Sequence, residues 1–187
     1  MTLAEMKKKA LSLIEELNPD SEYLTDDPDL QAKQNEVINQ VMYEMARLKK
    51  IAKYVEMEIS AGDKVTFADL ERECGYEVYQ IERVCGPKCV LKADGTVLKF
   101  VESGTAEIDL FVYPERITEN TKDNMYEFEL SPDALEIMPY GIAADLLKSD
   151  SSVNYGSVYA AEFERKIKRL DPRYHTGTIV VEGGVWF

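Results

Sequence analysis

Histidine and long apolar runs are the scarcest features of this chain of 187 residues. A serine or cysteine triad needs a histidine, and the only one, His175, falls in a loop expected after the last helix, which favours a surface contact over catalysis. No segment reaches the roughly 20 consecutive apolar residues that a membrane-spanning helix needs. The N-terminal apolar run is interrupted by Glu15 and Glu16, unlike the core of a signal peptide. We therefore expect no membrane association, and a protein that is made and folded in a cytoplasm.

Basic residues are few compared with acidic ones. The chain has 22 Lys and Arg against 35 Asp and Glu, which gives a formal net charge of −13. Duplex DNA and anionic lipid are both attracted by cationic surfaces, so we expect no sequence-specific binding of nucleic acid. Two interpretations stay open. The acidic surface either keeps the protein dispersed, or forms a wall past which nucleic acid slides without sticking.

Cysteine is also scarce, with Cys74, Cys85 and Cys89 as the only three. An odd number without a secretion signal does not indicate a disulfide framework. Cys85 and Cys89 flank a turn and Cys74 offers a third thiol, but a structural zinc site normally has four ligands. We expect buried or strand-borne cysteines, and neither a metal nor another cofactor.

Motifs for catalysis are missing, apart from paired carboxylates. The glycines in the body of the chain are scattered singly, so no glycine-rich phosphate loop is present. Carboxylate pairs can act as acid and base or bind divalent cations, which leaves one alternative function: a hydrolase or ligand-binding protein with a cleft lined by Glu56, Glu58 or Asp109. Acidic pairs arise readily among 35 acidic residues, and alternation at Glu56 and Glu58 is typical of an exposed strand face. We therefore expect no enzymatic activity.

Two amphipathic helices are predicted in the first 50 residues. The first runs from Leu3 to Leu17 and ends before Pro19, because a residue that precedes proline avoids helical geometry. The second begins at Asp27-Pro28, with an acidic cap and a proline in the first turn, and ends near Lys50. Their apolar stripes are Leu3, Met6, Ala10, Leu13, Ile14 and Leu17 in the first helix, and Leu30, Val37, Ile38, Val41, Met42, Met45 and Leu48 in the second.

The middle of the chain has the two-residue period of β-strands. Strands are predicted at 55–59, 76–84, 89–91, 96–101 and 106–113, with a turn at 61–63, a short helical turn at 66–71 and one more short strand at 126–130. Asp94-Gly95 between two apolar runs is a specific hairpin signal. Strands at such short spacing predict an antiparallel small barrel or sandwich.

A helical hairpin is predicted between Ser131 and Arg173. Ser131 supplies a capping hydroxyl and Pro132 is harmless in the first turn. Pro139 either kinks the first helix or separates two helical pieces that meet at Met138. The second helix has its apolar stripe at Tyr155, Tyr159, Phe163, Ile167 and Leu170, and the two helices should pack antiparallel.

These elements predict an α+β fold in which two helix pairs form a bundle and an antiparallel β module is inserted between them. The expected units are a discontinuous helical domain at 1–52 and 125–175, an inserted β domain at 53–124, and an extended tail at 176–187. The tail places three apolar residues after Gly183-Gly184, where they would form an exposed apolar patch if left in solvent. Addition of a strand to the chain's own sheet, or to a neighbouring subunit, would cover them.

The helical parts carry a family resemblance. The segment from Leu130 to Leu147 starts a helix at a serine and a proline, passes through Pro139-Tyr140 and contains an Ala-Ala step, and a polar break and a second helix follow. Residues 24–29, which lead into 37–41, show a similar pattern at the second predicted helix. Both resemble head-completion and head–tail adaptor proteins of tailed bacteriophages, although the long β segment departs from the smallest, all-helical adaptors.

The resemblance implies a structural, non-enzymatic protein of a phage or prophage virion, made in the host cytoplasm. Such adaptors form rings below the portal and connect it with the tail, so the implied partners are portal, tail or neck proteins and further copies of the same chain. The acidic balance fits a channel lining that does not grip DNA. The candidate assembly contacts are Pro139, Tyr140, Val185, Trp186 and Phe187.

Overall fold

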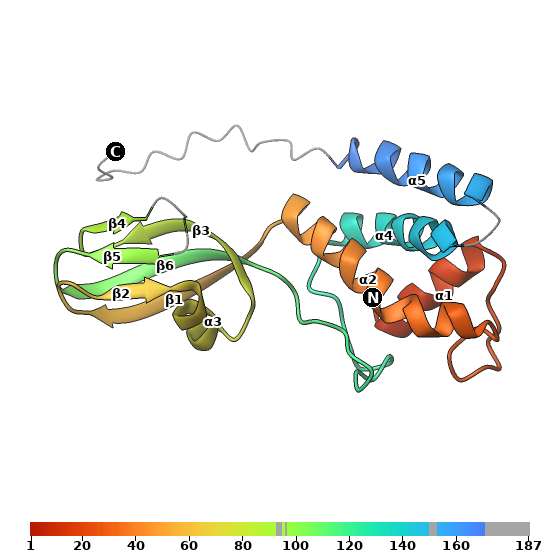
Figure 1. Ribbon diagram of the computed structural model, residues 1–187, viewed down its shortest axis with the longest axis horizontal. Coiled ribbons are helices and arrows are strands. Elements are labelled where there is room, and N and C mark those ends of the chain that lie inside the picture. Colours follow the sequence, from red (N-terminus) through yellow and green to blue (C-terminus); the bar gives the residue numbers. More distant parts are fainter. Residues whose placement is uncertain (93–94, 96, 150–152, 171–187) are drawn as a thin grey trace.

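The computed structural model describes residues 1–92, 95, 97–149 and 153–170. In Figure 1 the longer helices lie at one end of the molecule, and the strands lie at the other end together with one short helix, α3 (Phe67–Cys74). The elements are α1 (Leu3–Leu13), α2 (Pro28–Leu48), β1 (Ile51–Ile59), β2 (Lys64–Thr66), α3 (Phe67–Cys74), β3 (Val78–Cys85), β4 (Cys89–Leu91), β5 (Val97–Phe100), β6 (Gly104–Val112), α4 (Pro132–Leu146), the 3-10 turn η1 (Leu147–Ser149) and α5 (Val153–Ile167). No helix in the described ranges is long and apolar enough to cross a membrane.

Local capping explains where several helices begin. The Asp27 carboxylate accepts hydrogen bonds from the first-turn amides of α2, which confirms the predicted start at Asp27-Pro28. Thr2 and Thr66 form capping boxes at α1 and α3. Ser131 occupies the cap position of α4, but its hydroxyl makes no capping hydrogen bond, so that part of the prediction is wrong.

The first helix is shorter than its sequence pattern. It ends at Leu13 instead of Leu17, because Glu15 takes a left-handed backbone conformation with a φ of 61° and turns the chain before Pro19 is reached. The amide of Glu16 donates to the carbonyl of Leu11 and closes this turn at 3.0 Å. The apolar pattern therefore predicted a length for α1 that is about one helical turn too great.

Helix α4 lies at the centre of the helical end and contacts α1, α2 and α5. Its own apolar residues are distributed around almost the whole helix, as expected of a helix that packs against partners on several sides. Helix α4 continues through Pro139 without interruption. The alternative in which two separate helical pieces meet at Met138 is therefore wrong. Helix α5 runs back along α4, which confirms the predicted hairpin (Figure 1).

The helical core contains most of the predicted stripes. The prediction of burial is wrong for two residues, Leu48, which is 41% exposed, and Tyr155, which is 69% exposed. Both lie in the terminal turn of a helix, where the apolar period extends beyond the packed surface. The fully buried members of this core are Leu3, Met6, Ala10, Leu11, Ile38, Met42, Met45, Ala46, Ile117, Ala134, Met138, Ile142 and Leu146.

The strands form two three-stranded antiparallel sheets, β1–β6–β3 and β2–β5–β4, which do not close into a barrel. The barrel alternative is therefore wrong. Inward side chains of both sheets and Leu70 of α3 make one apolar cluster. Strands β4 and β5 pair as the hairpin signal predicted, although Asp94 lies outside the described residues.

The chain returns from β6 to the helices through residues 113–131. The side chain of buried Asn39 accepts from the amide of Ile117 and donates to its carbonyl, at 2.9 and 2.8 Å. Tyr113 stacks on Tyr43 of α2, with ring centroids 4.6 Å apart. The strand expected at 126–130 is reduced to one isolated bridge between Glu127 and Thr2, because this segment packs on α1 and not in a sheet.

Candidate functional site

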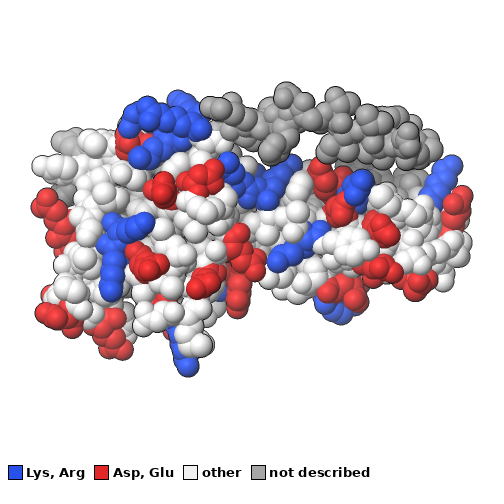
Figure 2. Space-filling view, turned by 180° about the vertical axis from the view of Figure 1, so that it is seen from behind, with Lys and Arg blue, Asp and Glu red and all other residues white. Residues whose placement is uncertain are grey.

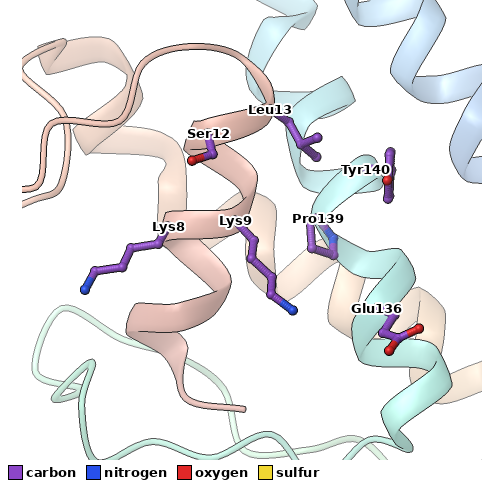
Figure 3. A pocket seen from close by; sticks show the side chains of 7 residues that line it. All are labelled: Lys8, Lys9, Ser12, Leu13, Glu136, Pro139 and Tyr140. Carbon is purple, nitrogen blue, oxygen red and sulfur yellow. The ribbon is translucent and has the colours of Figure 1, made fainter.

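A surface depression of about 400 Å³ lies between α1 and α4 (Figure 3). We call it the α1–α4 groove. It brings together residues more than 120 positions apart in sequence, and it includes both helical residues predicted as assembly contacts, Pro139 and Tyr140. Its lining is Lys8, Lys9, Ser12, Leu13, Glu136, Pro139 and Tyr140.

The α1 side of the groove is cationic. Lys8 and Lys9 are exposed and form no ion pair with any described residue. Their neighbour Lys7 differs, because it is buried and its ammonium lies 2.8 Å from the Asp123 carboxylate. In Figure 3, Lys9 extends into the space in front of α4, while Lys8 points away from α4. Lys9 is thus the cation best placed to meet a group that enters the groove.

The α4 side combines apolar and acidic groups. Pro139 is buried, and in Figure 3 its ring faces α1. Glu136, one turn earlier, is exposed. Tyr140 is half-buried, with the Lys166 ammonium of α5 4.5 Å from its ring centroid, a cation–π distance. The groove can therefore hold a segment with both charged and apolar side chains.

Helix α5 supports the groove from behind. The Tyr159 hydroxyl donates to the carbonyl of Leu13, which lines the groove. Phe163 packs directly on Gly141, so α4 and α5 approach closely where Pro139 and Tyr140 lie. The groove is therefore held by three helices, although only two line it.

The other predicted site residues are placed as follows. Val185, Trp186, Phe187 and His175 lie outside the described residues. The sequence did not predict Lys8, Lys9, Ser12, Leu13 and Glu136 as site residues, because no local pattern indicates that α1 and α4 lie side by side.

No protein-family model and no curated protein matches this chain.

The carboxylates of the alternative function lie on the outer face of the β1–β6–β3 sheet. Glu56 accepts a hydrogen bond from Tyr54, Glu58 from Thr105, and Asp109 from Arg83, at 3.2, 2.7 and 2.9 Å. None of them lines the α1–α4 groove or the second depression, which is formed by residues 115–126. On the face seen in Figure 2, acidic and basic side chains are interspersed, and the densest basic group lies at the helical end.

The cysteines do not assemble into a cluster. All three are free and partly buried. The Cys74 thiol lies 3.4 Å from the Tyr76 carbonyl, and burial raises the pKa of the Cys89 thiol, which lowers its reactivity. Within the described part of the chain, no group of three or more Cys, His, Asp and Glu side chains could hold a metal ion.

Proposed function

We propose that this chain is a structural protein of the head–tail neck of a tailed bacteriophage or prophage, an adaptor between portal and tail. The chain would act by assembly and not by catalysis, and would use no cofactor. It would be made in the host cytoplasm and become part of the virion.

One observation supports this proposal most strongly. Pro139 and Tyr140 belong to the segment that resembles phage adaptors, and both line the open α1–α4 groove. A groove with free lysines on one side and apolar residues on the other suits an acidic segment of another protein, because charge gives orientation and apolar contact gives affinity.

The fold is compatible with an adaptor. The helical core and the strand core are two separate apolar clusters. We propose that residues 1–52 and 125–175 act as one discontinuous helical domain, with 53–124 inserted as a second docking unit. The tail at 176–187, ending in Val185, Trp186 and Phe187, would dock on a neighbouring subunit or on the chain's own sheet.

The charge also fits a position near the DNA channel. A net charge of −13 opposes tight binding of the phosphate backbone. A neck protein must let DNA pass, so sequence-specific contacts with DNA are not part of this proposal.

Deletion of the gene from its phage or prophage tests the proposal. We expect electron micrographs of the lysate to show heads and tails that are not joined, and a plasmid copy of the gene to restore joined particles. Normal, infectious particles from the deletion strain would refute a role in the neck.

A further inference from the structure

The outer face of the β1–β6–β3 sheet is acidic. Side chains alternate across a sheet, and the register places Glu56 directly opposite Glu107, with Glu58 and Asp109 on the same face. Arg83 on this face is bound to Asp109 at 2.8 Å. At the edge of the face, the Lys50 ammonium lies 4.2 Å from the ring centroid of Phe111. Like charges directly opposite each other destabilise a sheet, so folding of a single chain does not explain the Glu56–Glu107 pair.

An exposed aromatic ring lies within this acidic face. Tyr54 is opposite Asp109 in the register and is 53% exposed. Desolvation raises the pKa of its hydroxyl, and the hydrogen bond to Glu56 and the charge of Glu107 raise it further. The face therefore offers negative charge together with an apolar anchor.

The outer face of the β2–β5–β4 sheet is basic. Lys64 lies directly opposite Lys99, a second like-charge pair, and Val90 lies on the other side of Lys99. Lys88 and Lys92 flank β4 and share the outward face with Val90, because side chains alternate along the strand. All four lysines are exposed and none makes an ion pair with a described residue. Val90 and Val101 on this face are more than half exposed.

The two charged faces point in opposite directions. The inward side chains of both sheets share one apolar cluster, so each sheet turns its outer face away from the other. An acidic face with an exposed aromatic and a basic face with exposed valines are thus complementary surfaces on opposite sides of the same chain.

We infer that the acidic face of β1–β6–β3 on one copy packs against the basic face of β2–β5–β4 on the next copy. Each copy would use a different face toward each neighbour, which makes the contact heterologous, and such contacts generate rings when the rotation closes. The inference deepens the proposed function, because it names the interface of the ring that an adaptor would form.

The size of the faces predicts a weak contact. The smaller sheet, β2–β5–β4, limits the contact: three strands about 4.8 Å apart and three to four residues long cover about 140–190 Å². This is well below the roughly 800 Å² per partner of stable complexes. Self-association in solution should therefore need high protein concentration and low salt, because salt screens exposed charges. Within a virion, attachment of the copies to a common ring would raise their effective local concentration enough for this contact to form.

Sedimentation velocity of the full chain, at rising concentration in low and high salt, tests the inference. We expect the weight-average mass to rise with concentration in low salt and to fall at 0.5 M salt. Reversal of the basic face by K64E with K99E, or of the acidic face by E56K with E107K, should raise the apparent Kd at least tenfold. The variant with all four changes should associate like the original chain, because the two faces are again opposite in charge.

A matched control separates this contact from net charge. Lys122→Glu with Lys168→Glu changes the net charge as much as the basic-face variant but alters two exposed residues outside both sheets. In low salt, the apparent Kd of this control should be no more than twice that of the original chain. Circular dichroism establishes that each variant is folded, and if a double charge reversal unfolds, the single changes K99E and E107K replace it.

Two results would overturn the inference: an original chain that stays monomeric in low salt at every concentration, or a folded four-fold variant that does not associate. Neither result would affect the neck location, which the gene deletion tests independently.

Discussion

Gly141 of α4 lies directly under the ring of Phe163 of α5. A Cβ atom at position 141 would come within 2.9 Å of two ring carbons, closer than real side chains approach. The pair determines how near α5 lies to the part of α4 that carries Pro139 and Tyr140.

Gly141→Ala should destabilise the protein by about 1–3 kcal/mol, because the added methyl forces Phe163 out of its position. Urea denaturation followed by circular dichroism measures the change. Gly156→Ala on α5 is the matched control, since its Cβ would meet its nearest atom at 3.4 Å, an ordinary contact. Alanine favours the helix by about 0.5–1 kcal/mol over glycine, so the control should be neutral or stabilised. Equal losses in both variants would contradict the packing described here.

The Lys7–Asp123 pair ties α1 to the return segment. Asp123→Asn should lower the free energy of unfolding by about 1–3 kcal/mol, because it leaves the buried Lys7 ammonium without its charged partner. Adding Lys7→Met should recover part of this loss, since an apolar side chain tolerates the site. A double-mutant cycle, measured by urea denaturation, gives the coupling free energy between Lys7 and Asp123. Additive losses would show that the pair does not act as a unit.

Acid should weaken the N-terminus of α4. The hydrogen bond from Lys49 lowers the pKa of Asp133 from 3.8 to about 2. A lowered folded-state pKa contributes stability that is present above pH 3.8 and is lost as the pH falls toward 2. Half of the Asp133 side chain is exposed, so the contribution at pH 7 should not exceed about 1 kcal/mol. In urea unfolding, Asp133→Asn should be less stable than the original chain at pH 7, and the difference should shrink between pH 4 and pH 2. A difference that stays constant with pH would rule out this ionic contribution.

The groove should matter for assembly and not for folding. Lys9→Glu reverses an exposed charge that extends toward α4, so the free energy of unfolding should change by less than about 0.5 kcal/mol. In the deletion strain, a plasmid copy carrying this change should restore at least tenfold fewer infectious particles than the original gene. Lys122→Glu, another exposed lysine outside the groove, serves as the control. Full complementation by Lys9→Glu would remove the groove from the proposed function.

Short-range signals in the sequence predicted much of the fold. Asp27-Pro28 marks the start of α2 because cap and first turn are adjacent in the chain. The β4–β5 pairing followed from a two-residue turn signal for the same reason. The end of α1 was missed, because the left-handed conformation of Glu15 is not encoded by apolar periodicity.

The site was harder to predict than the fold. Pro139 and Tyr140 stood out by residue type, but Lys9 became a candidate only once the packing of α1 on α4 was known. The charged sheet faces depended on register in the same way. Glu107 is opposite Glu56, and Lys99 opposite Lys64, only when the strand order is given. Alternation along a single strand predicts which residues share a face, but not which strand lies beside it.

Electron cryomicroscopy of purified particles tests the central proposal most directly. We expect a reconstruction of the neck to contain density, between portal and tail, that fits the five helices and two small sheets of this chain in a ring. A neck fully explained by other proteins, with this chain absent from the particle or located elsewhere in it, would contradict the account.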